Sequence, residues 1–177
     1  MGLTPLPGLV MGTRGGDVDA GVVFHLHREA GMSVADIEDL LTRHSGLLGL
    51  AGTGDLREVH RRAADGEDAA AEAIDLYCYR IRSYVGAYAA ALGRVDAVVF
   101  TAGVGEHDPD VRARVCAGLE GFGLRVDADR NTAPRTDVRT ISADDSAVAV
   151  LVVPTDEEGE IARYARALLG TDTREHR

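Results

Sequence analysis

The sequence feature that most constrains the fold is a change of hydrophobic period at Gly93. From residue 67 to residue 92, apolar side chains recur every three or four positions, a spacing that predicts one long helix. After Gly93 this period gives way to a β-branched apolar run over residues 97–101, and glycines follow the run. Such a run predicts a buried strand that ends in a tight turn. Asp108 and Pro109 then supply a cap and a first helical residue for the next helix. Helix, strand, Gly turn and helix in this order predict an α/β fold.

The residues before the long helix predict three shorter helices and two irregular segments. Residues 1–16 are rich in Gly, Pro and Thr, a composition typical of an irregular loop. Residues 45–55 are Gly-rich and apolar, so we expect a partly buried loop there. The helices are expected to follow capping residues with short polar side chains, namely Asp17 or Asp19, then Ser33, then Asp55.

The residues after the glycine turn predict a second strand and a last helix. Residues 147–153 are apolar throughout, as in an interior strand. Residues 124–126 and 140–142 are expected to form short edge strands. Thr155 and Glu158 have the spacing of a capping box, which predicts the start of the last helix.

Composition excludes several classes of protein. With 45% hydrophobic residues the chain can bury a core, which excludes disorder as its default state. The 29 acidic residues outnumber the 19 basic ones and give a formal net charge of −10. This balance argues against nucleic acid or an anionic membrane surface as a partner. There is no apolar run of transmembrane length and no secretory leader at residue 1, so we expect a cytoplasmic protein.

The basic residues are unusual, because the chain contains no lysine and all 19 of its strongly basic residues are arginine. This excludes a Walker-type phosphate lysine, a Schiff base and a Ser-Lys dyad. Anions must therefore be bound by arginine, by backbone N–H groups or through a metal. The six histidines lack metal-ligand spacing, and the two cysteines, Cys78 and Cys116, are expected to be reduced core residues.

Residues 103–108 form a glycine-containing segment that can bear on function. A Rossmann fingerprint needs a third glycine where Asp108 stands, so the dinucleotide interpretation fails. What remains is a strand-to-helix turn whose glycines allow a ligand to approach the backbone closely. From the residues alone, the segment is either a structural turn or a nucleotide contact.

Four charged residues are further candidates, and each has a simpler structural alternative. Arg14 lies in a Gly-rich loop, where its guanidinium can either bind a phosphoryl group in two directions or face solvent. Asp55 and Arg57 are either ligand contacts or a helix cap and a solvated side chain. Glu157 belongs to the first turn of a helix, where the dipole favours a carboxylate that can also hold Mg²⁺.

The order of these segments resembles the acetokinase family, the acetate kinases. Residues 1–6 read Met-Gly-Leu-Thr-Pro-Leu and residues 8–19 read Gly-Leu-Val-Met-Gly-Thr-Arg-Gly-Gly-Asp-Val-Asp, close to the family's second signature stretch. The family's order continues through residues 45–50, 55–57, 100–106 and 154–158. The resemblance covers nearly the whole chain. It implies the C-terminal lobe of the actin-like, sugar-kinase-like (ribonuclease H-like) ATPase fold.

The resemblance implies the conversion of acetate and ATP to acetyl phosphate and ADP, with Mg²⁺ as cofactor. It gives Arg14 the role of transition-state stabiliser at the transferring phosphoryl group, and Glu157 that of the Mg²⁺-associated carboxylate. The residues that match its nucleotide site are Asp55, Leu56 and Arg57 at adenosine, and Gly103, Val104, Gly105, Glu106 and His107 against adenine and ribose. The family usually has Asn at the position of His107. Phosphoryl transfer depends mainly on positioning and charge neutralisation, which suits a chain whose strong cations are all arginine.

The resemblance also implies that the chain is one part of a larger enzyme. The family's N-terminal Asn/Ser/Lys motif, acetate-pocket arginine, catalytic Asp, transition-state His and phosphate loop would all precede residue 1. We therefore expect residues 1–170 to be the C-terminal nucleotide-binding domain, inactive alone, with residues 171–177 as a frayed tail and the N-terminal acetate-binding domain absent. Family members generally form homodimers, and the Ala-rich helix over residues 67–92 is the expected contact surface. The alternatives are a stand-alone, non-catalytic nucleotide-binding or dimerisation module, and a lobe of a propionate or butyrate kinase.

Overall fold

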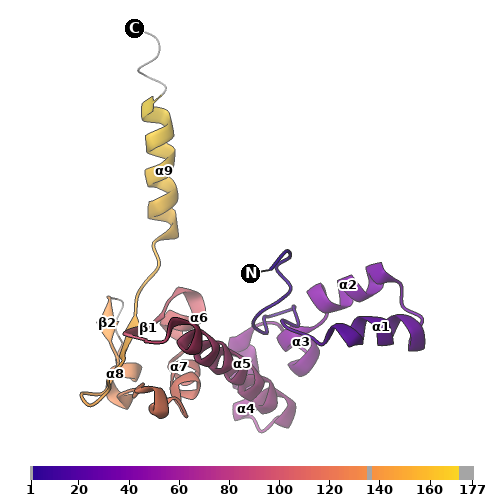
Figure 1. Cartoon of the computed structure of the whole chain (residues 1–177), viewed down its shortest axis with the longest axis horizontal. Coiled ribbons are helices and arrows are strands. Elements are labelled where there is room, and N and C mark those ends of the chain that lie inside the picture. The colour runs from indigo at the N-terminus through magenta and orange to yellow at the C-terminus, as the bar shows by residue number, and fades with distance from the viewer. Residues whose placement is uncertain (1, 135–136, 172–177) are drawn as a thin grey trace. The chain divides into compact units, whose positions relative to one another are not determined.

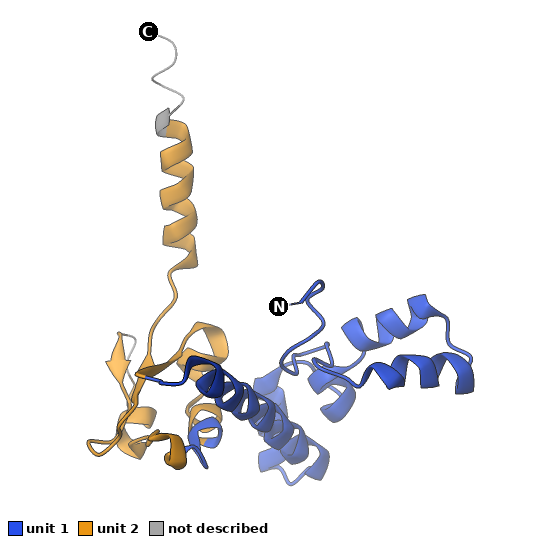
Figure 2. Cartoon of the chain, viewed as in Figure 1, with its two compact units in different colours: residues 1–95, 114–119 blue, residues 96–113, 120–177 orange. Residues whose placement is uncertain are grey.

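The computed structural model describes residues 2–134 and 137–171 (Figure 1). It divides into two compact units, which are coloured separately in Figure 2. Unit 1 comprises residues 1–95 and 114–119, and unit 2 comprises residues 96–113 and 120–177. The described residues combine helices with a mixed sheet, so the expected α/β class is confirmed.

In unit 1 the described residues before residue 95 form five helices: α1 (Ala20–Glu29), α2 (Val34–Arg43), α3 (Gly46–Ala51), α4 (Leu56–Ala64) and α5 (Asp68–Leu92). α5 packs against α3 and α4, while α1 packs against α2. Buried aliphatic side chains, among them Ile37, Val59 and Ile74, form the core of this unit. Cys78 and Cys116 are buried in it as expected.

The helix starts predicted in unit 1 are confirmed. The side chain of Asp19 accepts a hydrogen bond from the N–H of Gly21, and that of Asp55 accepts one from Arg57. Ser33 and Asp36 form a capping box, in which each side chain bonds the backbone of the other. At its other end, α5 stops as expected at Gly93, whose φ of 72° is left-handed.

The loop expected over residues 45–55 is a helix over half of its length, so this prediction is wrong. α3 begins at Gly46 and includes a second glycine, which intrinsic propensity disfavours. Its first N–H groups find acceptors outside the helix, because Leu47 donates to the carbonyl of Met11 at 2.9 Å and Leu48 to that of Gly12 at 2.8 Å. The N–H groups at the start of α3, which have no acceptor within the helix, are therefore satisfied by carbonyls of a distant chain segment.

Unit 2 is built on a three-stranded sheet in the order β1 (Ala97–Phe100), β3 (Ala149–Val152) and β2 (Arg139–Thr140). β1 pairs with β3 in parallel, and β2 pairs with β3 in antiparallel orientation. Val150 and Val152 are fully buried, which confirms the interior strand expected over residues 147–153. The helices that include residues of this unit are α6 (Ala102–His107), α7 (Pro109–Cys116), the short 3-10 helix η1 (Glu120–Phe122), α8 (Ala128–Thr132) and α9 (Glu157–Thr171).

Two predictions at the first strand need correction. β1 is not a fully buried strand, since Val99 is 51% exposed and no described strand covers its outer edge. The tight turn after it is α6, in which Ala102 adopts a φ of 59°. The start of α7 is confirmed, because the carboxylate of Asp108 accepts the N–H of Val111 at 3.0 Å and Pro109 is the first helical residue.

The remaining predictions in unit 2 are confirmed only in part. The expected edge strands are reduced to isolated bridges at Leu124 and between Val126 and Ser142, beside the two-residue β2. The capping box of the last helix does not form, because the Thr155 hydroxyl bonds Glu106 instead. The carboxylate of Asp156 accepts the N–H of Gly159 and provides the cap. The tail expected over residues 171–177 lies, beyond Thr171, outside the described residues.

None of the helices in the described ranges, 2–134 and 137–171, is long and apolar enough to cross a membrane.

Candidate functional site

Arg14 lies in the loop of residues 8–17, the Arg14 loop, which main-chain hydrogen bonds fix to the start of α3. Within the loop, the N–H of Met11 donates to the carbonyl of Arg14 at 3.1 Å. Ser45 donates to Thr13 at 3.0 Å, in addition to the bonds of α3 already described. Gly46 makes this approach possible, because a Cβ there would lie 2.2 Å from the carbonyl oxygen of Met11. Main-chain contacts with α3 therefore define much of the shape of the loop.

The guanidinium of Arg14 is half-buried and has little to bind within the chain. Its Nη1 lies 4.0 Å from the Sδ of Met11, a weak contact. Among the residues that the structure describes, no carboxylate pairs with it. In the described ranges, Arg28 and Arg166 also lack an ion pair but are exposed, whereas Arg14 is a half-buried arginine in a fixed loop and can bind an anion from outside the chain.

Asp17 ties the loop of Arg14 to the long helix α5. One carboxylate oxygen accepts the N–H of Gly8 at 2.8 Å, and the other accepts the Tyr84 hydroxyl at 2.5 Å and the guanidinium of Arg80 at 2.7 Å. The Tyr84 hydrogen bond is the main reason that the pKa of Asp17 lies below its ordinary value. Asp17 is therefore ionised at neutral pH and joins three chain segments.

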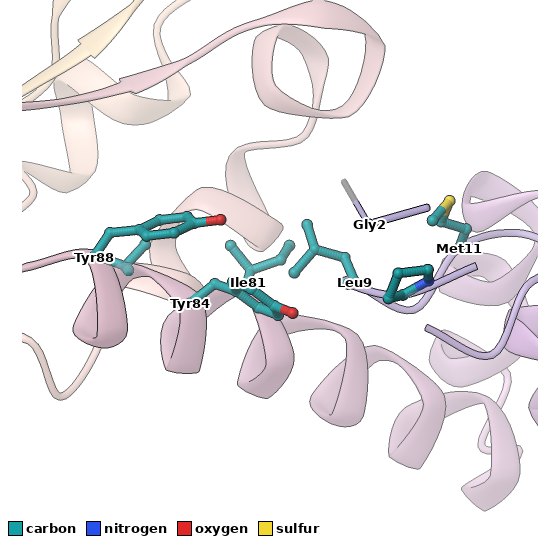
Figure 3. Close-up of a pocket in the computed structure, with 9 residues that line it drawn as sticks. Gly2, Leu9, Met11, Ile81, Tyr84 and Tyr88 are labelled. Carbon is teal, nitrogen blue, oxygen red and sulfur yellow. The ribbon is translucent and has the colours of Figure 1, made fainter. Parts of the chain in front are cut away.

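An apolar pocket of about 530 Å³ opens beside this loop, within unit 1. Figure 3 shows Leu9 and Met11 of the loop on one side and Ile81, Tyr84 and Tyr88 of α5 on the other. The residues that line the pocket are all uncharged, so its walls provide no side-chain cation for a phosphate. An anion held beside this pocket would therefore have to be bound by Arg14 or by backbone N–H groups.

Asp55, Leu56 and Arg57 mark the start of α4, beside the Arg14 loop. The two chain segments touch at glycines, because a Cβ on Gly12 would lie 2.9 Å from the carbonyl oxygen of Gly54. Asp55 both caps α4 and pairs with Arg57, whose Nη2 lies 2.7 Å from Asp55 Oδ2. This pairing lowers the pKa of Asp55. The Arg57 side chain is 92% exposed and thus available to a ligand.

Gly103 to His107 make up most of α6 in unit 2. A Cβ on Gly103 would meet only open space, whereas one on Gly105 would lie 3.1 Å from the main chain of Phe100. Gly103 thus leaves the backbone open to a ligand, and Gly105 lets α6 pack on the end of β1. The ring of His107 lies with Nδ1 3.0 Å from the carbonyl oxygen of Gly103 and is thereby held along the helix.

Glu106 is half-buried and forms hydrogen bonds within the chain. Its Oε1 accepts the N–H of Thr155 at 2.9 Å and the Thr155 hydroxyl at 3.0 Å. The backbone hydrogen bond from Thr155 is the main cause that lowers the pKa of Glu106. In unit 2, the structure therefore brings the segment of residues 103–107 together with the residues that lead into α9.

Glu157 is the first residue of α9, and its side chain is exposed. It has no hydrogen bond or ion pair to any residue in the described ranges. Those ranges also contain no group of three or more His, Cys, Asp or Glu side chains that could hold a metal. A single exposed carboxylate fits Mg²⁺, which is commonly bound by one or two carboxylates, waters and substrate phosphates.

Arg112 is a residue of the site that sequence reasoning missed. It is only 1% exposed, and its Nη1 donates to the carbonyl oxygens of Gly105 and Glu106, each at 2.9 Å. The available signal was an arginine between Val111 and Val115, two apolar residues of the same helix. An arginine in a helix is normally solvated, however, so the sequence pattern does not distinguish it.

The geometry in hand is that of an α/β protein with an unpaired arginine, a glycine-lined segment at the end of a strand and an exposed carboxylate. The chain matches the acetokinase family over residues 1–163. It is 59% identical over 170 residues to the acetate kinase of Clavibacter sepedonicus, covering 96% of this chain and 43% of that protein. It is 56% identical over 171 residues to the acetate kinase of Streptomyces avermitilis, covering 97% of this chain and 42% of that protein.

Solved structures show the same relationship. The crystal structure of Porphyromonas gingivalis acetate kinase matches with a TM-score of 0.89 and 45% identity, over 96% of this chain and 43% of that one. A propionate kinase from Francisella tularensis matches with a TM-score of 0.83 and 37% identity, over 89% of this chain and 40% of that one. The chain belongs to the acetokinase family, as the order of its motifs indicated. It spans about two fifths of the length of the relatives that it matches.

Proposed function

We propose that this chain supplies the nucleotide side of ATP-dependent phosphotransfer to a short-chain carboxylate, acetate first among them. In that reaction a carboxylate oxygen forms a bond to the γ-phosphorus, the bond from this phosphorus to the bridging oxygen breaks, and ADP leaves. The proposal includes the lobe itself, the C-terminal part of the actin-like, sugar-kinase-like (ribonuclease H-like) ATPase fold over residues 1–170. Family membership supports both.

The observation that carries the proposal is the state of Arg14. Its loop has a fixed main chain, and its guanidinium has no ion pair in the described part of the chain. We assign it to the transferring phosphoryl group, where charge neutralisation in the transition state lowers the barrier. Since a guanidinium stays protonated at any physiological pH, Arg14 stabilises charge and transfers no proton.

The nucleoside contacts are assigned to two groups of residues. In unit 1 these are Asp55, Leu56 and Arg57, where the pairing of Asp55 fixes the direction of an otherwise exposed guanidinium. In unit 2 they are Gly103, Val104, Gly105, Glu106 and His107, where the open side of Gly103 admits a ring against the backbone. His107 offers a ring nitrogen where the family usually has an amide.

Glu157 is the residue proposed to hold Mg²⁺, directly or through water. The metal would supply charge neutralisation on the phosphate oxygens when bound. The exposed carboxylate at the start of α9 is the part that this chain contributes.

The acid substrate and the partners are proposed from the relatives. The matched proteins are described as acetate kinases and, in one case, as a propionate kinase. We propose that the chain is inactive until residues equivalent to the remaining three fifths of those proteins complete it, that it is cytoplasmic, and that it forms a homodimer through α5. A stand-alone nucleotide-binding or dimerisation module is the second candidate, because the chain spans only about two fifths of its relatives.

Calorimetric titration of the chain with ATP and with ADP, each with Mg²⁺, tests the proposal. Because Arg14 is assigned to the phosphoryl group that ADP lacks, Arg14→Gln should weaken ATP binding by roughly tenfold and leave ADP binding unchanged. Arg43→Gln is the matched control, since Arg43 is an exposed arginine that pairs with Asp39. Absence of saturable binding of either nucleotide to the unaltered chain would overturn the proposal.

A second experiment separates the two candidate functions. The chain is incubated with ATP, Mg²⁺, acetate and hydroxylamine, alone and with the part of the Clavibacter sepedonicus acetate kinase that precedes its matched residues. Acyl hydroxamate in the mixture and none with the chain alone is the result expected for an incomplete enzyme. Nucleotide binding with no hydroxamate in either sample would favour the non-catalytic module.

A further inference from the structure

The buried guanidinium of Arg112 closes the end of α6 from inside unit 2. The last carbonyl groups of a helix have no partner within the helix. Here the carbonyl oxygens of Gly105 and Glu106 both accept from Arg112 Nη1. Because Arg112 is only 1% exposed, its guanidinium is shielded from water where it makes these bonds. The orientation of the two peptide groups is therefore set by one side chain.

Asn131 holds this guanidinium in place from the opposite side. Arg112 Nε donates to Asn131 Oδ1 and Nη2 donates to the carbonyl oxygen of Asn131, both at 2.7 Å. The Asn131 amide in turn donates to the carbonyl of Pro109 at 2.8 Å. Asn131 is 3% exposed and belongs to α8. The Arg112 network, defined as Arg112 and Asn131 with the carbonyls of Gly105, Glu106 and Pro109, thus joins α6, α7 and α8.

Apart from the bonds between Glu106 and Thr155 and the packing of Gly105 on the end of β1, α6 has little to fix its geometry. It is only six residues long, two of them are glycine, it has no side-chain cap and none of its residues is buried. Helices of this length and composition are not stable by themselves. A lysine at position 112 could not make the same set of hydrogen bonds, because a single ammonium group lacks the planar, forked arrangement of donors in a guanidinium.

From this dependence we infer that Arg112 and Asn131 are positioning residues for nucleotide binding, acting through the main chain of residues 103–107. The inference rests on the proposed function, which assigns that segment to the nucleoside. Neither side chain touches the ligand. Their effect is to keep the backbone beside Gly103 in the one arrangement that the ring of the nucleoside meets.

The test is ADP binding to Arg112→Lys and to the milder Asn131→Ala, measured well below the temperature at which each variant unfolds. ADP affinity should fall by roughly tenfold in both, the effect of losing hydrogen bonds made by a charged group. Amide hydrogen exchange should become faster in residues 103–107. Arg82→Lys is the matched control, because Arg82 also bonds helix carbonyls, those of Arg114 and Val115, but within unit 1.

The outcomes separate this inference from the proposed function. A lower unfolding temperature in Arg112→Lys, Asn131→Ala and Arg82→Lys alike, with ADP affinity unchanged in all three, would show a purely structural role and overturn the inference alone. Weaker ADP binding in the first two variants and not in the control supports it. Failure of the unaltered chain to bind ADP would overturn the proposed function and this inference together.

Discussion

Two of the segments that carry candidate ligand contacts, the loop of Arg14 in unit 1 and α6 in unit 2, are held in different ways. The loop is fixed by main-chain bonds to α3 and by the carboxylate of Asp17, whose side chain is 39% exposed. α6 is fixed by a guanidinium that is 1% exposed. The Arg14 loop therefore depends on backbone fit and on a group in contact with water, whereas α6 depends mainly on a buried side chain.

This difference determines what each segment is sensitive to. A carboxylate at the surface changes its charge within the acidic pH range, whereas a guanidinium does not lose its proton in proteins. We therefore expect acid to weaken the contacts of Asp17 in the Arg14 loop while the contacts of Arg112 at α6 persist. Loss of a buried donor, by contrast, should affect α6 strongly at every pH.

The largest expected effect is at the contact between the Arg14 loop and α3. Gly46→Ala places a Cβ 2.2 Å from the carbonyl of Met11 at a residue whose φ is 60°. The substitution would strain the backbone at position 46 and disrupt the main-chain contact with Met11. The free energy of unfolding, measured by urea denaturation, should therefore fall by about 4 kcal/mol. Gly86→Ala in α5 is the control, since a Cβ there meets nothing within 4 Å. Equal stability of the two variants would show that the loop is not held by close backbone contact.

The next effect is at the buried side of the comparison. Arg112→Met removes the donor to the carbonyls of Gly105, Glu106 and Asn131 and should lower the free energy of unfolding by about 3 kcal/mol. The acceptors in these bonds are carbonyl oxygens, which do not titrate, so the loss should be observed at pH 4 as well as at pH 7. A loss that disappears at pH 4 would contradict the assignment.

A smaller effect is expected at Asp17, where the sign with pH can be worked out. Its folded-state pKa lies below the ordinary 3.8, so the stabilisation is present above that value and is lost as the pH falls through the lower folded pKa. Asp17→Asn should therefore cost less than about 1 kcal/mol at pH 7 and nothing in strong acid. Asp36 belongs to the exposed capping box of α2, and its pKa is also lowered, so Asp36→Asn should show the same pH dependence. Only Asp17→Asn should also weaken ATP binding, and equal ATP binding in the two variants would contradict a role for Asp17 at the Arg14 loop.

The smallest effect on folding is expected at Arg57. Its side chain is 92% exposed and, among the described residues, pairs only with Asp55, so Arg57→Gln should leave the unfolding midpoint unchanged. ADP affinity should nevertheless fall, because the proposed function assigns this guanidinium to the nucleoside. Arg61→Gln, on the next turn of α4, should leave ADP affinity unchanged. A shifted midpoint without a change in ADP affinity would give Arg57 a structural role instead.

The sequence predicted those elements whose determinants are local. Caps at Asp19, Ser33 and Asp55, the long period of α5 and the apolar run of β3 each depend on residues close in the chain, and the structure confirms them. The Gly-rich helices α3 and α6 were predicted as loop and turn. Their backbone groups are satisfied by carbonyls and donors from distant segments, which no local pattern contains.

The candidate site shows the same division. Arg14, Asp55 and Glu157 were predicted because their residue types and neighbours point to anion or metal chemistry, and the roles assigned to them remain proposals. Arg112 was missed because its importance lies in complete burial, and burial of an arginine follows from how α6, α7 and α8 meet. Thr155 was predicted as a helix cap, although its hydroxyl bonds a carboxylate that lies 49 positions earlier in the chain.

That bond between Thr155 and Glu106 has a mechanical consequence. Glu106 Oε1 accepts hydrogen bonds from both the backbone N–H and the hydroxyl of Thr155. Because two donors from one residue meet one oxygen, the link resists shear as well as tension. A force applied to α9 can thus reach α6 through this side chain as well as along the main chain through β3 and β1. Because the pKa of Glu106 is lowered, this joint persists into conditions more acidic than an ordinary glutamate would withstand.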